Sequence, residues 1–425
     1  MGAEGNCLPL DVDTATSTQQ AAAPVASPPG PSTRRVALAI TALAIGGFAI
    51  GTTEFVTMGL LPDVASSVGV SVPTGGHLIS AYALGVVVGA PTIAALGAKL
   101  PRRLLVLALM GMFVVGNALT ALAPGYGTLL LARFVAGLPH GAYFGVASLI
   151  AASLVRPEVR GRAVSSVMIG LAVANIVGVP GATWLGQGLG WRAAYWAVVA
   201  IGALTIVCVL AVVPRVRARS EASIRSELGA LRRPQVLLTL LAGIVGFGGM
   251  FALYSYIAPL VTDVAGASSS FVPVVLLVFG TGMLLGTTLG GRLADRALFP
   301  SLIGAVLAMG VALALVAMAA SSVWTLVPVV FAVAATSSVL VVCLQLRLMR
   351  VAGEAQMLGA ALNHSALNLA NALGAWLGGL VIAAGSGYTA PSTVGAGLAV
   401  LGLLVFGVSA LLRRRQLAAD PTANA

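Results

Sequence analysis

Long apolar runs of about 20 residues alternate with short polar breaks along most of the chain. Since an α-helix rises about 1.5 Å per residue, each run is long enough to cross the ~30 Å hydrocarbon core of a lipid bilayer. The pattern predicts an all-α membrane protein with twelve transmembrane helices, at residues 36–58, 76–97, 104–122, 128–150, 163–186, 193–213, 236–258, 272–291, 301–320, 324–346, 357–383 and 392–412.

The composition excludes a soluble globular protein. Of the 425 residues, 59% are apolar and only 8% are charged, and the mean hydropathy is +1.02. Such values are typical of proteins that cross the bilayer many times. Cys7, Cys208 and Cys343 are too few and too scattered for a disulfide framework or a metal site, so we interpret them as unpaired thiols.

The basic residues indicate the orientation of the chain in the membrane. Of the 23 lysines and arginines, 21 lie in seven segments that alternate along the chain, and the exceptions are Arg133 and Arg192. Positive charge accumulates on the cytoplasmic side of membrane proteins, so both termini are expected in the cytoplasm. The net charge of +11 is therefore explained by membrane topology, and we predict no nucleic-acid partner.

The chain is expected to form two six-helix bundles. Residues 1–35 and 413–425 are predicted to be cytoplasmic tails, the first disordered because it is rich in Ala, Pro, Ser and Thr. A basic cytoplasmic loop at 214–235 separates residues 36–213 from 236–412.

The two bundles repeat each other. Several Gly and Pro residues recur 197 positions later, and two further residues recur 196 positions later. The pairs are Gly51 and Gly248, Pro62 and Pro259, Gly85 and Gly282, Gly89 and Gly286, Gly190 and Gly387, Asn175 and Asn371, and Gly178 and Gly374. A duplicated bundle that rocks around a site near the midplane is the architecture of a secondary transporter.

Glu54 is the one acidic residue that falls inside an apolar run. It lies about 18 residues, or ~27 Å, along the first predicted span, which places it in the outer third of the bilayer. The other eleven acidic residues fall in tails or in loops between the runs. A carboxylate inside the membrane is energetically costly, so Glu54 is a candidate functional residue.

Two further candidates lie in the fourth span. Arg133 is predicted at about the same depth as Glu54, so the two can satisfy each other's charge. The pair either couples protonation to conformational change or is a static ion pair between the first and fourth spans. His140 follows seven residues later on the same face, where it either relays protons or is a neutral histidine bonded between helices.

Polar side chains on other spans indicate a substrate cavity. His364, Asn368 and Asn371 share one face of the eleventh span, and Asn371 corresponds to Asn175 in the first bundle. This stripe either faces a cavity or forms hydrogen bonds between helices. Tyr254 and its neighbour Tyr256 either contact a lipophilic substrate or belong to the aromatic belt at the membrane interface.

Several motifs resemble the major facilitator superfamily, and specifically its drug:proton antiporter branch, over residues 36–412. Arg133-Phe-Val-Ala-Gly137 is similar to the branch's Arg-x-x-x-Gly motif, and Gly178-Val-Pro180-Gly181 to its antiporter motif, from which it departs at Val179. Gly291-Arg-Leu-Ala-Asp295-Arg296 matches the family's cytoplasmic loop motif, which is degenerate in the first half. This departure in the first half is similar to a subgroup of the branch that resembles arabinose-efflux-permease-like, purine-ribonucleoside-efflux and some chloramphenicol-efflux proteins.

The resemblance implies the major facilitator fold and a monomer in the inner or plasma membrane. It also implies export of a small organic solute or drug in exchange for protons, with Arg133 in proton coupling and Asp295 and Arg296 in conformational change. From its place inside the membrane, we expect Glu54 to carry the proton, with Arg133 as its partner. The alternatives are a symporter or facilitator for a sugar, nucleoside or other metabolite, and a membrane sensor that signals through its N-terminal tail. We expect no cofactor and no enzymatic activity, because the sequence has no Walker-type motif, HExxH or nucleophile elbow.

Overall fold

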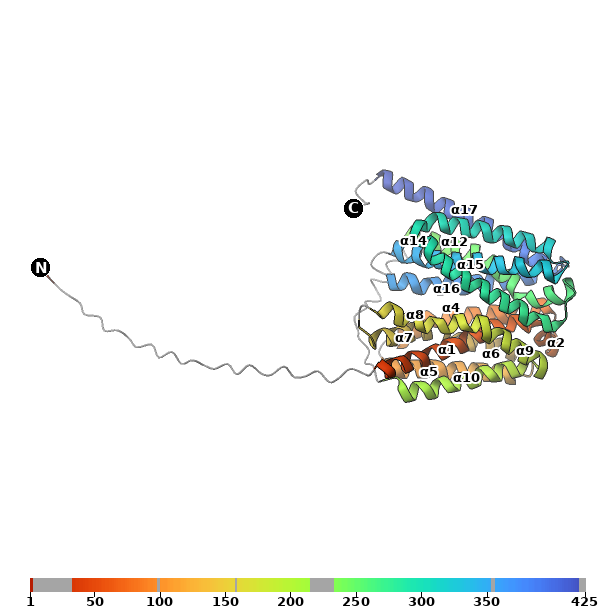
Figure 1. Cartoon of the computed structure of the whole chain (residues 1–425), viewed down its shortest axis with the longest axis horizontal. Coiled ribbons are helices and arrows are strands. Elements are labelled where there is room, and N and C mark those ends of the chain that lie inside the picture. Colours follow the sequence, from red (N-terminus) through yellow and green to blue (C-terminus); the bar gives the residue numbers. More distant parts are fainter. Residues whose placement is uncertain (3–32, 98–99, 157–158, 215–232, 353–355, 420–425) are drawn as a thin grey trace.

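A computed structural model describes residues 1–2, 33–97, 100–156, 159–214, 233–352 and 356–419. Over these residues the chain is built from helices without strands, and most of the helices run roughly parallel to one axis (Figure 1). The N-terminal helices, coloured red to yellow-green, lie in one half of the molecule, and the green to blue C-terminal helices lie in the other. The predicted N-terminal tail and most of the central basic loop fall outside the described residues.

The N-terminal half contains six membrane crossings. Two of these crossings are interrupted, the fourth between α6 and α7 and the fifth by the π-helix η2. The helices are α1 (Thr33–Gly59), α4 (His77–Gly97), α5 (Arg102–Leu122), α6 (Tyr126–Gly137), α7 (His140–Ser153), α8 (Arg160–Val173), η2 (Ala174–Gly178), α9 (Val179–Leu189) and α10 (Trp191–Val212). Gly190, with a φ of +91°, makes the reversal between α9 and α10, a conformation that glycine adopts without steric cost.

The C-terminal half repeats this arrangement. Its long helices are α12 (Pro234–Ser255), α14 (Val272–Ala319), α15 (Val323–Ala352), α16 (Gln356–Ala383) and α17 (Ala390–Ala419). Short helices connect crossings on one side of the molecule, namely α2 (Leu61–Ser67), α3 (Val72–Gly75), α13 (Ile257–Pro259), the π-helix η3 (Leu260–Val264) and the 3-10 helix η4 (Ser269–Phe271).

The number of crossings depends on the long helix α14. Eleven helices in the described part of the chain are long and apolar enough to span a membrane. The 48 residues of α14 would measure about 72 Å if straight, more than twice a ~30 Å hydrocarbon core. Its backbone leaves the helical conformation at Ala297, with φ −158° and ψ 83°, so the two arms are the predicted spans 272–291 and 301–320. The twelve-span, two-bundle fold is therefore confirmed.

Matched glycines hold corresponding helices together in the two halves. A side chain at Gly85 or Gly89 on α4 would clash with the carbonyl oxygens of Phe134 and Leu138, respectively, in the fourth span. At the duplicated positions on α14, Gly282 and Gly286 lie in the same way against the carbonyl oxygens of Phe331 and Ala335 on α15. Both glycines and both carbonyls are 197 positions apart, so the sequence repeat corresponds to one helix–helix contact made twice.

The two halves meet at the end of the molecule that carries α2 and α3. There, Ser80 on α4 donates a hydrogen bond to the carbonyl of Ala372 on α16 at 3.0 Å, and Tyr256 packs against Gly76. At the opposite end, no hydrogen bond joins the halves among the residues that the structure describes. This conformation is therefore closed at the α2 and α3 end.

One arginine counted with the loops is buried. Arg347 was expected to follow the tenth span, but it lies inside α15 and is 4% exposed. Its guanidinium donates to Gln235 at 3.2 Å and to Ser409 at 2.9 Å, and it lies 4.6 Å from the ring of Phe299 near the α14 bend. The prediction that Arg347 belongs to a loop was therefore wrong. Counting basic residues along the sequence does not show which buried polar groups lie beside each of them.

The expected orientation is testable by cysteine labelling from outside intact cells. In a background without the native cysteines, Ser66→Cys, at an exposed position of α2, should react with a membrane-impermeant maleimide. The segments that alternate with the basic ones, such as the one that holds Asp63 and Ser66, are predicted to be external. Ser226→Cys in the central basic loop should react only after the cells are permeabilised. Reaction at position 226 but not at 66 in intact cells would reverse the orientation.

Candidate functional site around Glu54

Glu54 lies in the last turns of α1, close to where the two halves meet. It is 6% exposed, and residues from Gly51 to Gly59 around it are all buried. The neighbouring Phe55 ring stacks at 6.4 Å on Phe251 and meets Tyr254 edge-on at 5.7 Å, and both partners belong to α12 of the other half. The carboxyl group is thus enclosed at the interface between the two halves.

Arg133 occupies the interior of the first half beside Glu54. Its side chain is fully buried and its guanidinium donates to the hydroxyl of Thr53 at 3.3 Å and to the Thr53 carbonyl at 3.2 Å. It is close enough to Glu54 for an electrostatic interaction, but within the described residues Glu54 makes no ion pair or hydrogen bond. Instead of the expected direct pair with Glu54, Arg133 is hydrogen-bonded to Thr53, the residue before Glu54.

A polar network behind Arg133 fixes this arrangement. The Thr53 hydroxyl also donates to Asn117 on α5, and the amide of Asn117 donates to the carbonyl of Phe113 at 2.8 Å. Thr57 and Tyr195 share a hydrogen bond at 2.7 Å, and the Tyr195 ring lies 5.7 Å from the guanidinium carbon. Sequence reasoning missed these residues, because a threonine or asparagine in an apolar run is common and carries no signal alone.

Tyr82 connects Arg133 with His140. The Arg133 guanidinium carbon lies 4.3 Å from the centre of the Tyr82 ring, and the Tyr82 hydroxyl shares a 3.0 Å hydrogen bond with Nδ1 of His140. Phe144, one turn after His140, stacks on His364 of α16 with 6.4 Å between ring centres. Three of the predicted site residues, Arg133, His140 and His364, thus belong to one series of contacts that reaches the other half.

The predicted polar stripe on α16 is buried and has unused hydrogen-bonding groups. Asn368 is 4% exposed and Asn371 is fully buried. Among the residues that the structure describes, the Asn368 oxygen and both polar atoms of the Asn371 amide have no hydrogen-bond partner, and neither have the two side-chain polar atoms of Asn363. On the other half, Asn175 is 5% exposed and its oxygen also has no partner. Buried polar groups are normally paired, so these amides are suited to bind water or a solute.

Tyr254 in α12 and Tyr256 at the C-cap of this helix are both buried, so the alternative that they belong to an aromatic belt at the membrane interface is wrong for this pair. Tyr254 and Tyr256 are each 1% exposed. Tyr254 lies 4.2 Å from the ring of Phe279, whereas Tyr256 donates its hydroxyl to the carbonyl of Ala375 at 2.7 Å. Tyr254 therefore remains beside Phe55 and Glu54, and Tyr256 contributes to the closed end of the molecule.

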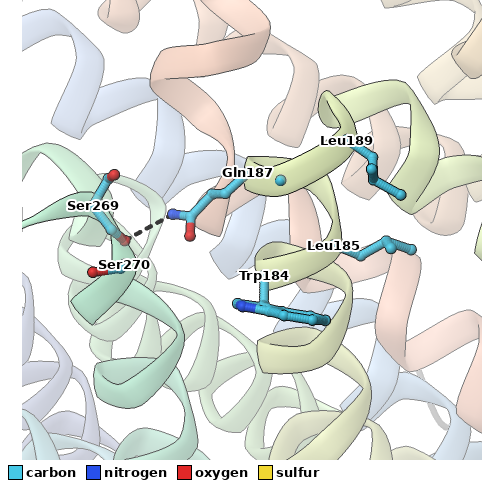
Figure 2. A pocket seen from close by; sticks show the side chains of 7 residues that line it. Trp184, Leu185, Gln187, Leu189, Ser269 and Ser270 are labelled. Atoms are coloured by element: carbon cyan, nitrogen blue, oxygen red, sulfur yellow. Dashed lines mark hydrogen bonds between the residues drawn. The ribbon is translucent and has the colours of Figure 1, made fainter.

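A hollow of about 520 Å³ lies farther out, between α9 and η4 (Figure 2). The amide of Gln187 donates to the carbonyl of Ser269 at 2.8 Å across it and so connects the two halves. Trp184 and Leu189 on its wall are 68% and 74% exposed, as lipid-facing residues at a membrane interface would be. Because the hydrogen bond from Gln187 to Ser269 crosses this hollow, the hollow belongs to the contact that closes the two halves, and no charged or titratable side chain is among its lining residues.

Comparison with known proteins identifies the fold and the family. Residues 43–357, which are most of the chain, match the Major Facilitator Superfamily. The chain belongs to the major facilitator superfamily. It is 45% identical over 372 residues to the inner membrane transport protein YdhP of Escherichia coli (strain K12), covering 87% of this chain and 95% of YdhP.

A second relative and a solved structure extend this comparison. The chain is 41% identical over 258 residues, 60% of its length, to a chloramphenicol resistance protein of Streptomyces lividans, of which it covers 66%. The structure of a D-xylose-proton symporter superposes with a TM-score of 0.70 at 17% identity, covering 88% of this chain and 97% of the symporter. This protein is therefore a major facilitator transporter in fold and family.

The antiporter-like segment of this major facilitator protein forms an irregular turn against α1. Pro180 has no backbone N–H to donate to the preceding turn, and the helix widens into η2 just before it. A side chain at Gly178 would clash with the hydroxyl of Thr52, two residues from Glu54. Gly181 borders an apolar hollow of about 210 Å³ between α1, α9 and α10. The irregular segment is therefore in contact with the helix that carries Glu54.

The cytoplasmic loop motif of the family lies at the bend of α14. Gly291 is half-buried, and Asp295 and Arg296 are exposed just before the irregular Ala297. Within the described part of the chain, neither charged side chain makes a hydrogen bond or ion pair. The first-half positions Ala94 and Ala98 fall among residues whose side chains are not described. No group of three or more His, Cys, Asp or Glu that could hold a metal ion occurs in the described residues.

Proposed function

We propose that this transporter exports a small organic solute in exchange for protons, as a monomer in the inner or plasma membrane with both termini in the cytoplasm. The observation that carries the proposal is the buried Glu54 carboxyl beside the fully buried Arg133, at the interface of the two halves. An ionisable residue at such a position is costly and is retained for function in most membrane proteins. Glu54 binds the transported proton and Arg133 provides the charge that favours its release.

The change in the protonation of Glu54 depends on the second half of the molecule. Arg133 and Glu54 both belong to the first half, and Arg133 is attached to Thr53 of the same helix, so these groups move together when the halves rock. The aromatic cover from α12, by contrast, separates from Phe55 when the interface opens. External water and protons then reach Glu54, so the carboxyl binds a proton from outside, and closure over it favours this neutral form. Solute and proton compete for this space, which gives exchange.

The residues near the interface suit a small, largely uncharged organic solute. Tyr254 supplies an aromatic surface, and the unpartnered amides of Asn175, Asn368 and Asn371 supply hydrogen-bond donors and acceptors. His364 adds a titratable ring at the same interface. The name of the Streptomyces lividans relative, a chloramphenicol resistance protein, supports a drug-like solute.

A proton-coupled symporter is the second candidate. It is supported by the fold shared with a D-xylose-proton symporter, since the same two-bundle architecture serves both directions of coupling. A solute panel tests the proposal. Cells that express the protein should gain resistance to, or export of, at least one compound, and cells that express Glu54→Gln should lose it. Solute accumulation that rises with the inward proton gradient would favour the symporter.

Asp295 is proposed to close the cytoplasmic side in the outward-facing state. It is exposed and makes no ion pair within the described part of the chain, in a conformation whose opposite end is closed, so a charge-assisted contact of Asp295 is proposed for the other state. Asp295→Asn should lower transport several-fold and increase the reactivity of cytoplasm-facing cysteines, because the population moves toward inward-open. Ala98→Asp should not improve transport. Equal transport by Asp295→Asn and the wild type would contradict this gate.

A further inference from the structure

The fourth membrane crossing is broken between two residues of the candidate site. Helix α6 ends at Gly137 and α7 begins at His140. Between them the Leu138 N–H pairs with the carbonyl of Val135, only three residues back, at 3.2 Å. Pro139 has no N–H to continue the ladder, and proline is a common cause of helix kinks. Arg133 lies before this break, and His140 lies immediately after it.

Tyr82 contacts both sides of the break. Its ring lies 4.3 Å from the Arg133 guanidinium carbon, and its hydroxyl lies 3.0 Å from Nδ1 of His140. The tyrosine is fully buried, and Gly137 lies so close to its backbone that a side chain there would clash with the Tyr82 carbonyl oxygen. It also interacts electrostatically with Glu54. Tyr82 therefore contacts both Arg133 and His140 and lies close enough to Glu54 to interact with its charge.

We propose that Tyr82 is a positioning residue that holds Arg133 beside Glu54 and links this pair to His140 across the break in the fourth span. The inference deepens the proposed proton coupling and rests on it. Neutral His140 can accept from or donate to the Tyr82 hydroxyl, whereas a protonated His140 must donate at Nδ1. Protonation of His140 thus fixes the Tyr82 hydroxyl as the acceptor, at the edge of the ring whose face supports Arg133.

The other groups that face His140 show that its contact with Tyr82 lies near the interface between the two halves. On its own helix His140 packs against Phe144 with 5.4 Å between ring centres, and Phe144 stacks on His364 of α16. The two histidines interact electrostatically across the halves. From α4 the facing group is Tyr82, with Arg133 and Glu54 behind it. When the halves separate, His364 moves away from Phe144 and His140. The contacts of Tyr82 with His140 and Arg133 then transmit this change to Glu54.

Labelling of Glu54 by a hydrophobic carbodiimide tests the inference without substrate or gradient. The reagent modifies protonated buried carboxyl groups, and peptide mass spectrometry reads the extent on purified full-length protein, with Glu54→Gln as the blank. Tyr82→Leu removes the ring beneath Arg133 and should raise labelling at pH 7 by about threefold or more. Tyr143→Phe is the matched control, because it also removes a buried tyrosine hydrogen bond, to the Leu43 carbonyl at 2.8 Å. It should leave labelling unchanged.

The hydroxyl is tested separately by Tyr82→Phe, which keeps the ring and preserves folding. His140→Gln should change Glu54 labelling in the wild type and should have no such effect in the Tyr82→Phe background, because the connection is already cut. Equal labelling of Tyr82→Leu and Tyr143→Phe, or an equal effect of His140→Gln in both backgrounds, would overturn the inference. If wild-type vesicles move no protons, proton exchange fails while the labelling result still decides the role of Tyr82.

Discussion

Glu54→Gln should abolish proton-driven export and leave solute exchange without a gradient measurable. Glutamine has nearly the same shape as a protonated glutamate, so the buried site under Phe251 and Tyr254 stays filled, but no proton can be bound or released. Export driven by a pH gradient in proteoliposomes should fall to the level of vesicles without protein. Counterflow of labelled against unlabelled solute should continue, because it needs only the movement of the loaded transporter.

Two outcomes would contradict this role of Glu54. Full gradient-driven export by Glu54→Gln would show that the proton uses another group, and His140 would be the next residue to test. Loss of counterflow together with export, in a variant that folds normally, would mean that Glu54 binds solute and not a transported proton.

Arg133→Ala should be more damaging than Glu54→Gln. It removes two hydrogen bonds to Thr53 and leaves the Glu54 carboxyl without its neighbouring cation inside the membrane. Breaking one side of a buried charge pair typically costs about 3–5 kcal/mol. We therefore expect a lower melting temperature in detergent, a lower yield, and loss of both export and counterflow.

The double variant separates the charge effect from the packing effect. In Glu54→Gln/Arg133→Ala no charge is left unpaired, so part of the lost thermal stability should return although transport remains absent. If the double variant is as unstable as the sum of the two single variants, the interaction between Glu54 and Arg133 is negligible. Arg133 would then serve only the packing of α1, α4 and α6.

The fold could be predicted from the sequence because the bilayer imposes it. Lipid cannot satisfy backbone polar groups, so each apolar run of about 20 residues must form a helix. The repeat offset also located a real contact, since Gly85 and Gly282 face equivalent carbonyls in the two halves. The hydrophobic pattern predicted a span that ends at residue 291, but the first arm of α14 continues almost to the bend at Ala297. The pattern could not show this, because the helix extends beyond the apolar run into the polar segment that follows it.

The candidate site was only partly predictable. Glu54 stood out because a carboxyl group inside an apolar run is rare, and depth counting placed Arg133 at the same level. Depth does not give rotation about the helix axis, and the guanidinium turned out to bond to Thr53. Tyr82 was missed because a tyrosine in an apolar run has no distinguishing pattern. Its role depends on contacts with residues 51 and 58 positions away in sequence.

Proton movement caused by solute tests the central claim most directly. Wild-type protein is reconstituted with a pH-sensitive dye inside the vesicles, and solute identified by the panel is added outside without an imposed proton gradient. Exchange predicts that solute entry drives protons out, so the lumen becomes more alkaline, and that Glu54→Gln gives no signal. A lumen that becomes more acidic as solute enters, or a signal of equal size from Glu54→Gln, would contradict proton exchange at Glu54.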